Sequence, residues 1–302
     1  MIIVVIGAGF IGKHLIRSFL ALDCEVRVLD RNPCPSEFSS LLVWVRADYR
    51  DRSALRQVLV NADVVYHLVS STVPGDLHVD IASELHDNVV GSLGLLDLCL
   101  ENCAKRLVFL SSASVYGVQE RTPIDEYAAT WPISFHGVHK LAIEKYLWIA
   151  HRQRGLDVRV LRLANPYGPG QDIQGRQGFV AIALGRLLRG ETIILRGGAE
   201  TVRDFIYIDD AVDAIASAGL LDDVPFLVNV GSGVGHSLLD VVRVISELSG
   251  RELLLSHEPS RGMDIPVSIL DGSLAREALR FIPQVPLRLG IEKTLTHFGL
   301  HF

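Results

Sequence analysis

The chain begins with a short apolar segment that runs directly into a glycine-rich turn. Residues 2–6 are all isoleucine or valine, and glycines follow at Gly7, Gly9 and Gly12. A helical pattern covers 10–22, and a second apolar segment at 25–29 ends beside Asp30. In such a unit the glycines permit a tight turn, close approach of backbone N–H groups to a pyrophosphate, and close packing of helix on strand, while the acid binds a ribose. The segment therefore predicts a dinucleotide-binding unit rather than a glycine turn of some other α/β protein.

Short β-branched runs alternate with helical patterns through the first half of the chain. The expected strands lie at 2–6, 25–29, 42–46, 63–68, 106–110 and 157–163, and the expected helices at 10–22, 52–60, 81–103 and 136–154. Alternation of this kind indicates a parallel sheet covered by helices on both faces, with ligands bound beyond the carboxyl ends of the strands. We therefore expect an α/β fold with a Rossmann-type doubly wound parallel sheet.

The pattern changes near residue 168, because residues 165–170 read Asn-Pro-Tyr-Gly-Pro-Gly, which is typical of a turn. Beyond it we expect a helix at 178–190, a strand near 193–196, a Gly-Gly turn at 197–198, a strand–helix unit at 204–219, a strand at 226–230, and two or three helices with short strands in the last seventy residues. We place a dinucleotide-binding domain at 1–168, with a segment that returns to it at about 201–231. A smaller interleaved C-terminal domain occupies 169–302.

Composition limits the partners and the location. The net charge is −6 without a basic stripe, which argues against nucleic acid. No apolar stretch approaches the ~20 residues that span a bilayer, and the apolar start lacks the basic residues of a signal peptide. We expect a cytoplasmic protein that uses no metal and no membrane. The chain has four cysteines and no C-x-x-C pair: Cys24, Cys34, Cys99 and Cys103. The last two are four residues apart and would share one face of a helix. Buried, apolar cysteines are favoured over a metal or redox role.

Polar side chains follow several of the expected strands. Asp48 follows the third strand, where it would either bind an adenine amino group or act as an ordinary acid at a helix N-terminus. His67 closes the fourth strand and by itself indicates a core histidine. Ser111 and Ser112 follow the fifth strand, where a hydroxyl would either bind substrate or belong to a serine-rich turn.

Together these motifs resemble those of the extended short-chain dehydrogenases, in the branch of nucleotide-sugar epimerases and dehydratases. The similarity covers nearly the whole chain, in order, at residues 7–12, 47–48, 66–68, 112–117, 162–170, 203–210 and 229–233. It is nearest to UDP-glucose 4-epimerase-like proteins. The sugar dehydratases carry Thr-Asp-Glu where this chain has Ser-Ala-Ser at 112–114, and without that acid pair the elimination of water has no obvious acid or base.

The resemblance implies NAD as the cofactor and assigns most of its binding residues to the first four strands: Gly7, Gly9, Phe10, Ile11, Gly12, Asp30, Arg31, Asp48, Tyr49 and Leu68, with Lys140 at the nicotinamide ribose. It also implies a nucleotide-diphosphate sugar as substrate, with a UDP-sugar favoured. Its diphosphate would be held by Asn165, Arg203 and Arg261, since a guanidinium binds phosphate oxygens bidentately. The usual fate of an arginine is a surface salt bridge, which is the alternative for both arginines.

The resemblance further implies a homodimer that pairs through the helices at 81–103 and 136–154. The first of them carries apolar residues enough to cover both a sheet and a partner: Val89, Val90, Leu93, Leu96 and Leu100. The alternative is a monomer in which one helix is well buried.

The chain departs from the family pattern in three places. Val5-Ile6 stand where the family has Thr-Gly, and residues 261–264 read Arg-Gly-Met-Asp instead of Arg-x-Gly-Asp. The family's catalytic Tyr-x-x-x-Lys is represented here by His136-Gly-Val-His-Lys140. No lysine of the chain follows a tyrosine at this spacing. The third departure affects the residue that would act as base.

Two classes of function follow from these observations. The resemblance implies an epimerase that removes a hydride at the sugar C4 and returns it to the other face, with Ser112, His136 and Lys140 as catalytic residues. A neutral imidazole accepts protons near pH 7, so we expect weak activity that rises with pH as His136 loses its proton. The alternatives are a non-catalytic or weakly active homologue that binds NAD and a nucleotide sugar, and a nucleotide-sugar reductase that exchanges its cofactor at each turnover.

Overall fold

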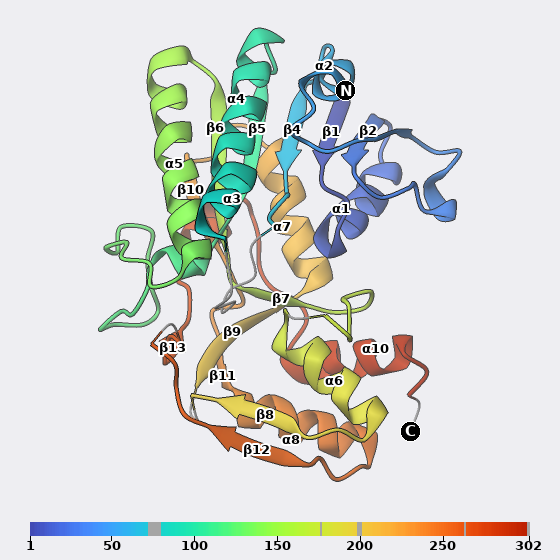
Figure 1. Ribbon diagram of the computed structural model, residues 1–302, viewed down its shortest axis with the longest axis vertical. Helices are drawn as coiled ribbons and strands as arrows, with labels where there is room; N and C mark the ends of the chain where they lie inside the picture. Colours follow the sequence, from blue (N-terminus) through green and yellow to red (C-terminus); the bar gives the residue numbers. More distant parts are fainter. Residues whose placement is uncertain (72–79, 176, 198–200, 263, 301–302) are drawn as a thin grey trace.

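The computed structural model describes residues 1–71, 80–175, 177–197, 201–262 and 264–300. Its largest element is a seven-stranded sheet in the order β10-β6-β5-β4-β1-β2-β3, in which every pair is parallel. The strands are β1 (Ile2–Ile6), β2 (Glu25–Asp30), β3 (Val43–Arg46), β4 (Val64–His67), β5 (Arg106–Ser112), β6 (Asp157–Leu163) and β10 (Leu227–Val230). The α/β fold with a doubly wound parallel sheet is confirmed (Figure 1).

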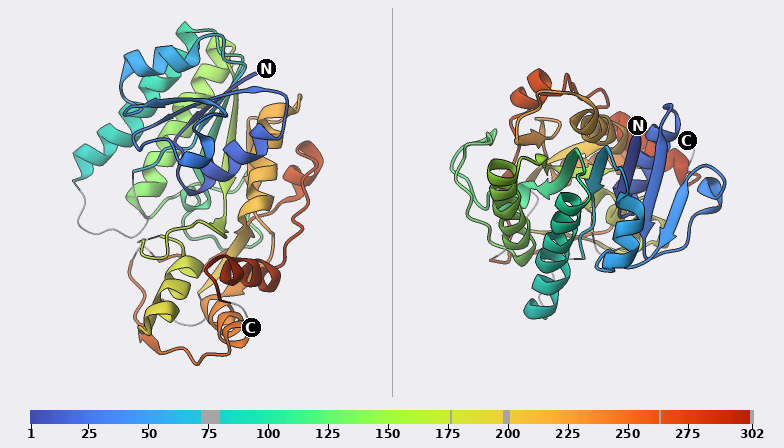
Figure 2. Two further views of the ribbon diagram at one scale, coloured as in Figure 1. Left: turned by 90° about the vertical axis from the view of Figure 1, so that its right-hand side faces the viewer. Right: turned by 90° about the horizontal axis from the view of Figure 1, so that it is seen from above.

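Helices cover both faces of this sheet, as the view from above shows (Figure 2). One layer is formed by α1 (Phe10–Leu20) and α7 (Ile208–Leu220). The other layer is formed by α2 (Arg52–Leu59), α4 (Gly91–Glu101) and α5 (Phe135–Arg154). Strand side chains alternate between the two layers, so that Val5 packs in the core of the first and Ile6 in the core of the second. Because both faces are buried, the central strand β1 is apolar throughout instead of alternating with polar residues.

The helix expected at 81–103 is a continuous helical segment with an irregular centre. α3 (Ile81–Leu85) leads through a π-helical turn, η2 (His86–Val90), into α4, which ends at Glu101. Cys103 lies beyond the helix with a φ of 52° and is exposed. The prediction that it shares a buried helix face with Cys99 is therefore wrong, because the chain has left the helix before residue 103. Cys99 is buried, and Cys24 and Cys34 are half-buried.

The smaller region lies below the large sheet in Figure 1. Its strands are β7 (Asn165–Tyr167), β8 (Ile193–Arg196), β9 (Val202–Tyr207), β11 (Gly235–Ser237), β12 (Leu255–Glu258) and β13 (Val267–Ser268), and its helices are α6 (Phe179–Arg189), α8 (Leu238–Ser249), α9 (Ser273–Ala278) and α10 (Leu287–His297). β9 pairs with β7, β11 and β13, while β8 pairs with β12. The chain then returns through α7 and β10 to the large sheet.

Two expected turns differ from the structure or fall partly outside it. The first half of the turn expected at 165–170 is strand β7, because β9 offers it a pairing edge; the turn begins at Gly168. Gly197 has a φ of 78°, whereas Gly198 lies outside the described residues. The remaining short helices are η1 (Ser36–Phe38) and η3 (Ala113–Val115). Over the described part of the chain, no helix has the length and apolar character needed to cross a bilayer.

Candidate active site

A cavity of about 910 Å³ opens at the carboxyl ends of the strands of the large sheet, around the point between β1 and β4 where the strand order reverses. That position is the usual ligand site of a doubly wound sheet, and the volume suits a small-molecule site. All but one of the predicted site residues line it: Gly7, Gly9, Phe10, Ile11, Gly12, Asp30, Arg31, Asp48, Tyr49, Leu68, Ser112, His136, Lys140, Asn165 and Arg203. Arg261 is not among the described lining residues.

The glycine turn at the start of the chain leaves space for a ligand. A Cβ on Gly12 would lie 2.2 Å from the carbonyl oxygen of Gly7, so the third glycine is required by packing. Gly9, in contrast, would meet nothing within 4 Å. It caps α1 without a side-chain hydrogen bond, and the first turn of α1 holds no acidic residue. The residues that begin α1 therefore border a space that suits an anion such as a pyrophosphate, since the first N–H groups of a helix have no partner within it.

Asp30 ends β2 with its carboxylate fixed in place. Its Oδ2 accepts the Ala8 N–H at 2.7 Å, and its Oδ1 accepts the backbone and side-chain N–H groups of Asn32 at 2.8 and 2.9 Å. A carboxylate offers about four acceptor positions, so room remains for a further donor. The arrangement suits a ribose hydroxyl, with Arg31 also lining the cavity.

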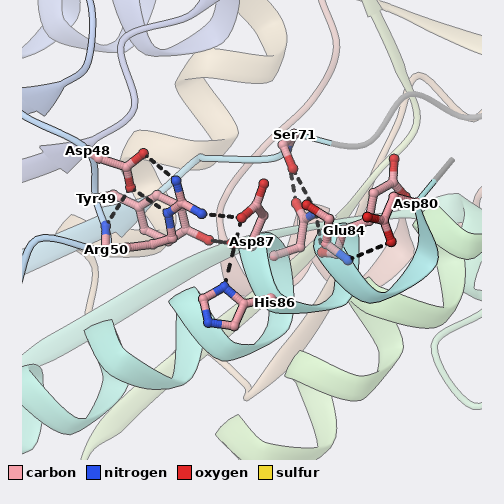
Figure 3. A network of polar contacts seen from close by, with 10 residues as sticks. Asp48, Tyr49, Arg50, Ser71, Asp80, Glu84, His86 and Asp87 are labelled. Carbon is pink, nitrogen blue, oxygen red and sulfur yellow. Dashed lines mark hydrogen bonds and ion pairs between the residues drawn. The ribbon is translucent and has the colours of Figure 1, made fainter.

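The loop after β3 is bound to the π-helical turn η2, as Figure 3 shows. Asp48 accepts hydrogen bonds from Arg50, whose Nε and Nη2 lie 2.8 Å from its two oxygens, and these bonds hold the pKa of the Asp48 carboxyl below its usual value. Arg50 also pairs with Asp87, and the Tyr49 hydroxyl donates to the Asp87 carbonyl. Burial raises the pKa of Tyr49 to about 12.

Arg50 and Asp87 both line the cavity, yet sequence reasoning did not identify them. They lie 37 residues apart, and no local pattern indicates their pairing. The same turn also holds the segment after β4, because Asn88 accepts the Ser71 N–H at 2.9 Å and donates to the Ser71 hydroxyl at 2.8 Å (Figure 3). η2 therefore fixes two cavity-lining segments at once.

Two predicted catalytic side chains lie on the first turns of α5. Ser134 caps the helix by accepting the Gly137 N–H at 3.2 Å, and His136 and Lys140 then lie one helical turn apart, 7% and 5% exposed. The Lys140 Nζ donates to the Leu110 carbonyl at 2.8 Å, at the end of β5. Ser112, two residues further along, accepts the Ser114 N–H at 3.1 Å. One helix and one strand end therefore bring the three predicted catalytic residues to the same cavity.

Burial controls the charges of this group. Burial lowers the pKa of Lys140 to about 8. Burial, with added repulsion from Lys140 and His139, lowers the pKa of His136 to about 3. His136 is therefore neutral at every pH near neutrality. The activity rise expected from its loss of a proton would be complete far below pH 7, so that part of the prediction does not hold for this site.

The three residues predicted to bind the diphosphate differ in the contacts that they already make within the protein. The Asn165 side chain donates to the Asp204 carbonyl at 3.0 Å. Arg203 donates to the Val202 carbonyl at 2.8 Å, and burial lowers the pKa of its guanidinium. Arg261 forms an ion pair with Asp264 at 2.8 Å, and it is Asp264 that lines the cavity. Of the two arginines predicted to bind the diphosphate, Arg203 is therefore the one that lines the cavity.

His67 belongs to the core. It is 2% exposed, and its Nε2 lies 2.7 Å from the Ser92 hydroxyl. Burial lowers its pKa to about 3. The interpretation of this residue as a core histidine is confirmed.

Comparison with known proteins identifies the family of this chain. The model of the "NAD dependent epimerase/dehydratase family" matches residues 3–231, and the chain belongs to this family. It is 33% identical to a UDP-glucose 4-epimerase of Mycolicibacterium smegmatis over 96% of both chains, and 29% identical to a dTDP-4-dehydro-6-deoxyglucose reductase of Escherichia coli over 96% of this chain and 94% of that one.

Solved structures show the same relationship. The UDP-glucose 4-epimerase of Thermotoga maritima with UDP-glucose has a TM-score of 0.91 at 32% identity, and that of Thermus thermophilus in complex with NAD has 0.90 at 31% identity. Each comparison covers 99% of both chains.

Proposed function

We propose that this protein is an NAD-dependent epimerase that acts at C4 of a UDP-hexose or a similar nucleotide sugar. The observation that carries the proposal is that one cavity is lined by the Gly9 turn and Asp30, by Ser112, His136 and Lys140, and by Arg203. The names of the relatives support it, since several are UDP-glucose 4-epimerases. The region from residue 169 onward would hold the nucleotide sugar.

The residues present fit NAD. The open space at Gly9 and the first turn of α1 would hold the pyrophosphate, and Asp30 would hold the adenosine ribose. Lys140 would bind the nicotinamide ribose. When bound, NAD supplies reversible acceptance of a hydride from the substrate.

The protein's own residues would position the sugar and move its proton. Ser112 would hydrogen-bond the reacting hydroxyl, and His136 would accept its proton. The Lys140 ammonium would stabilise negative charge that develops there. A neutral imidazole whose conjugate acid has a pKa of about 3 is a weak base, so we expect slow turnover.

Native mass spectrometry followed by a turnover screen tests this function. We expect the purified protein to retain NAD and to convert at least one UDP-sugar into its C4 epimer. Retained NAD and bound UDP-sugar without any turnover would instead support a non-catalytic binding homologue. Failure to bind either ligand would overturn both proposals.

A second candidate is a nucleotide-sugar reductase, and the 29% identity to the E. coli reductase favours it. An epimerase regenerates its cofactor within one turnover, whereas a reductase must exchange it. Net consumption of added NADH with a 4-keto nucleotide sugar would identify the reductase.

The cofactor should be NAD and not NADP. A 2′-phosphate would lie against the fixed Asp30 carboxylate, where like charges repel. We expect NAD to bind at least about tenfold more tightly in parallel fluorescence titrations, which corresponds to about 1.4 kcal/mol. Arg31 is the residue able to reverse this result by pairing with the phosphate, and tighter binding of NADP would overturn the assignment.

Arg203→Ala should weaken binding of a UDP-sugar by about tenfold or more. A charge-assisted hydrogen bond contributes roughly 1.5–3 kcal/mol. Burial lowers the pKa of the Arg203 guanidinium, and an anion beside it would offset that cost. Isothermal titration with UDP and with UDP-glucose measures the loss, and NAD binding serves as the control that should not change. Arg261→Ala offers a matched comparison, with a smaller expected loss because Asp264 already pairs with that arginine. Equal binding by wild type and Arg203→Ala would refute the role.

The protein should be a homodimer. Exposed apolar side chains lie along the proposed pairing helices: Leu85, Val90, Val138, Tyr146 and Ile149. Burying them against a second copy would remove apolar surface from water. Multi-angle light scattering at micromolar concentration should give twice the 33.2 kDa chain mass, and a single 33.2 kDa species would contradict the dimer.

A further inference from the structure

A buried ion pair lies between α5 and the large sheet. Arg162 on β6 binds Glu144 on α5 through two hydrogen bonds, Nη2 to Oε2 at 2.7 Å and Nε to Oε1 at 3.1 Å, and each side chain is 3% exposed. The Ser111 hydroxyl donates to the same carboxylate, and Ser111 pairs with Arg162 in the strand register. Burying two full charges is costly, and nonpolar residues of similar volume often stabilise a fold as well as such a pair does. The pair therefore calls for a role other than stability.

The ion pair lies directly beside Lys140. Glu144 follows Lys140 by one helical turn on the same buried face of α5. Lys140 donates to the carbonyl of Leu110, and Leu110 precedes the Ser111 that Glu144 binds. The carboxylate thus fixes both the helix that carries Lys140 and the strand end that receives its hydrogen bond.

The charged and titratable groups around Lys140 come from three elements. His136, His139 and Glu144 lie on α5, His67 lies on β4, and Arg162 lies on β6. The three imidazoles have pKa values lowered by burial and stay neutral near pH 7. The charged members of this group are then Lys140, Arg162 and Glu144; Arg162 hydrogen-bonds the Glu144 carboxylate, and Lys140 is attracted to it electrostatically. Attraction from Glu144 opposes the effect of burial on the pKa of Lys140.

We propose that Glu144 and Arg162 are positioning residues that set the protonation state of Lys140, with Glu144 favouring the ammonium and Arg162 restraining that effect by sharing the carboxylate. The role of Lys140 in turnover rests on the proposed function, but its protonation state does not. Burial lowers the pKa of Lys140 to about 8 and the ion pair adjusts it from there, whereas an exposed lysine stays charged throughout the physiological range.

Nuclear magnetic resonance of protein from which bound NAD has been removed, labelled with ¹³C at the lysine ε-carbon, measures this directly. The chain has five lysines, Lys13, Lys105, Lys140, Lys145 and Lys293, and Lys140→Met assigns the relevant signal. We expect wild type to titrate with a pKa of about 8. Glu144→Gln should move the Lys140 titration to lower pH by about one pH unit or more, and Arg162→Gln should move it to higher pH by a similar amount.

The charge-conserving variants are the matched controls. Arg162→Lys and Glu144→Asp should leave the titration closer to wild type than the neutral variants do. Shifts of the same sign in Glu144→Gln and Arg162→Gln, or no shift, would overturn the proposal and leave the pair a purely structural link. If either neutral variant fails to fold, the other decides by the direction of its shift.

If both fail, Ser111→Ala removes one hydrogen bond from the carboxylate and should move the titration upward by a few tenths of a pH unit, and an unchanged titration would then overturn the proposal. Where turnover is detectable, its pH profile should shift in the same order. Absence of turnover would count against the proposed function alone, since the titration is measured in the free protein.

Discussion

His136→Phe is expected to abolish turnover of nucleotide sugars, which means a loss of about 100-fold or more. His136→Tyr is expected to preserve or raise it. His136 lines the cavity, is buried, and lies one turn before Lys140 on α5. Phenylalanine retains the buried ring but removes both nitrogens, so no group remains to accept the proton of the sugar hydroxyl. A phenol reaches roughly 2 Å further than an imidazole, and positioning errors of this size change rates by ~10²-fold.

The pH dependence separates the two groups. Because the pKa of His136 is about 3, wild-type activity should be flat between pH 6 and 7 instead of rising. Lys140, with a pKa of about 8, loses its positive charge above that pH, so activity should decline there. Steady-state assays of wild type and both variants over pH 6–9 measure the flat region and the decline above it.

NAD binding and thermal stability serve as controls for both His136 variants and should match wild type. Unchanged turnover in His136→Phe would show that His136 is not the base and would direct attention to Ser112 or a bound water. If neither wild type nor His136→Tyr turns over any nucleotide sugar, the binding homologue becomes the better interpretation.

Gly9→Ala should fold normally and lose most of its affinity for NAD. The backbone at Gly9 has a φ of −71°, which alanine adopts, and the added Cβ meets no protein atom within 4 Å. The methyl group would instead occupy the space assigned to the pyrophosphate. Overpacking of this kind costs about 1–3 kcal/mol, so NAD affinity should fall about tenfold or more while the melting temperature stays the same.

Gly12→Ala is the matched variant, because its Cβ would lie 2.2 Å from a backbone oxygen and the turn itself would have to shift. It should lose several degrees of melting temperature together with NAD binding. Calorimetry with NAD, and with UDP as a control ligand, distinguishes the two effects. Wild-type NAD affinity in Gly9→Ala would show that the cofactor does not approach this glycine.

Much of the fold and of the cavity follows from local sequence. The glycine turn, the strand ending at Asp30 and the alternating segments predict the large sheet, because these signals depend on residues close in the chain. β7 was not predicted, since Asn165-Pro-Tyr forms a strand only where β9 pairs with it. Cys103 was misplaced because the end of a helix is weakly encoded.

The missing parts of the site depend on contacts between distant residues. Arg50 meets Asp87, and Glu144 meets Arg162, only because the fold brings distant parts of the chain together. The low pKa of His136 has the same origin, since burial is a property of the whole fold and not of the residues around position 136.

The π-helical turn η2 sets how the residues before α4 are rotated about the helix axis. A π turn accommodates one residue more than an α turn, and each residue of an α-helix advances the direction of its side chain by about 100°. With one residue fewer between Asn88 and α4, Asp87 and Asn88 would be rotated by that angle relative to α4 and would no longer both face Arg50 and Ser71. The extra residue therefore keeps side chains of this long helix directed toward the two loops that it contacts.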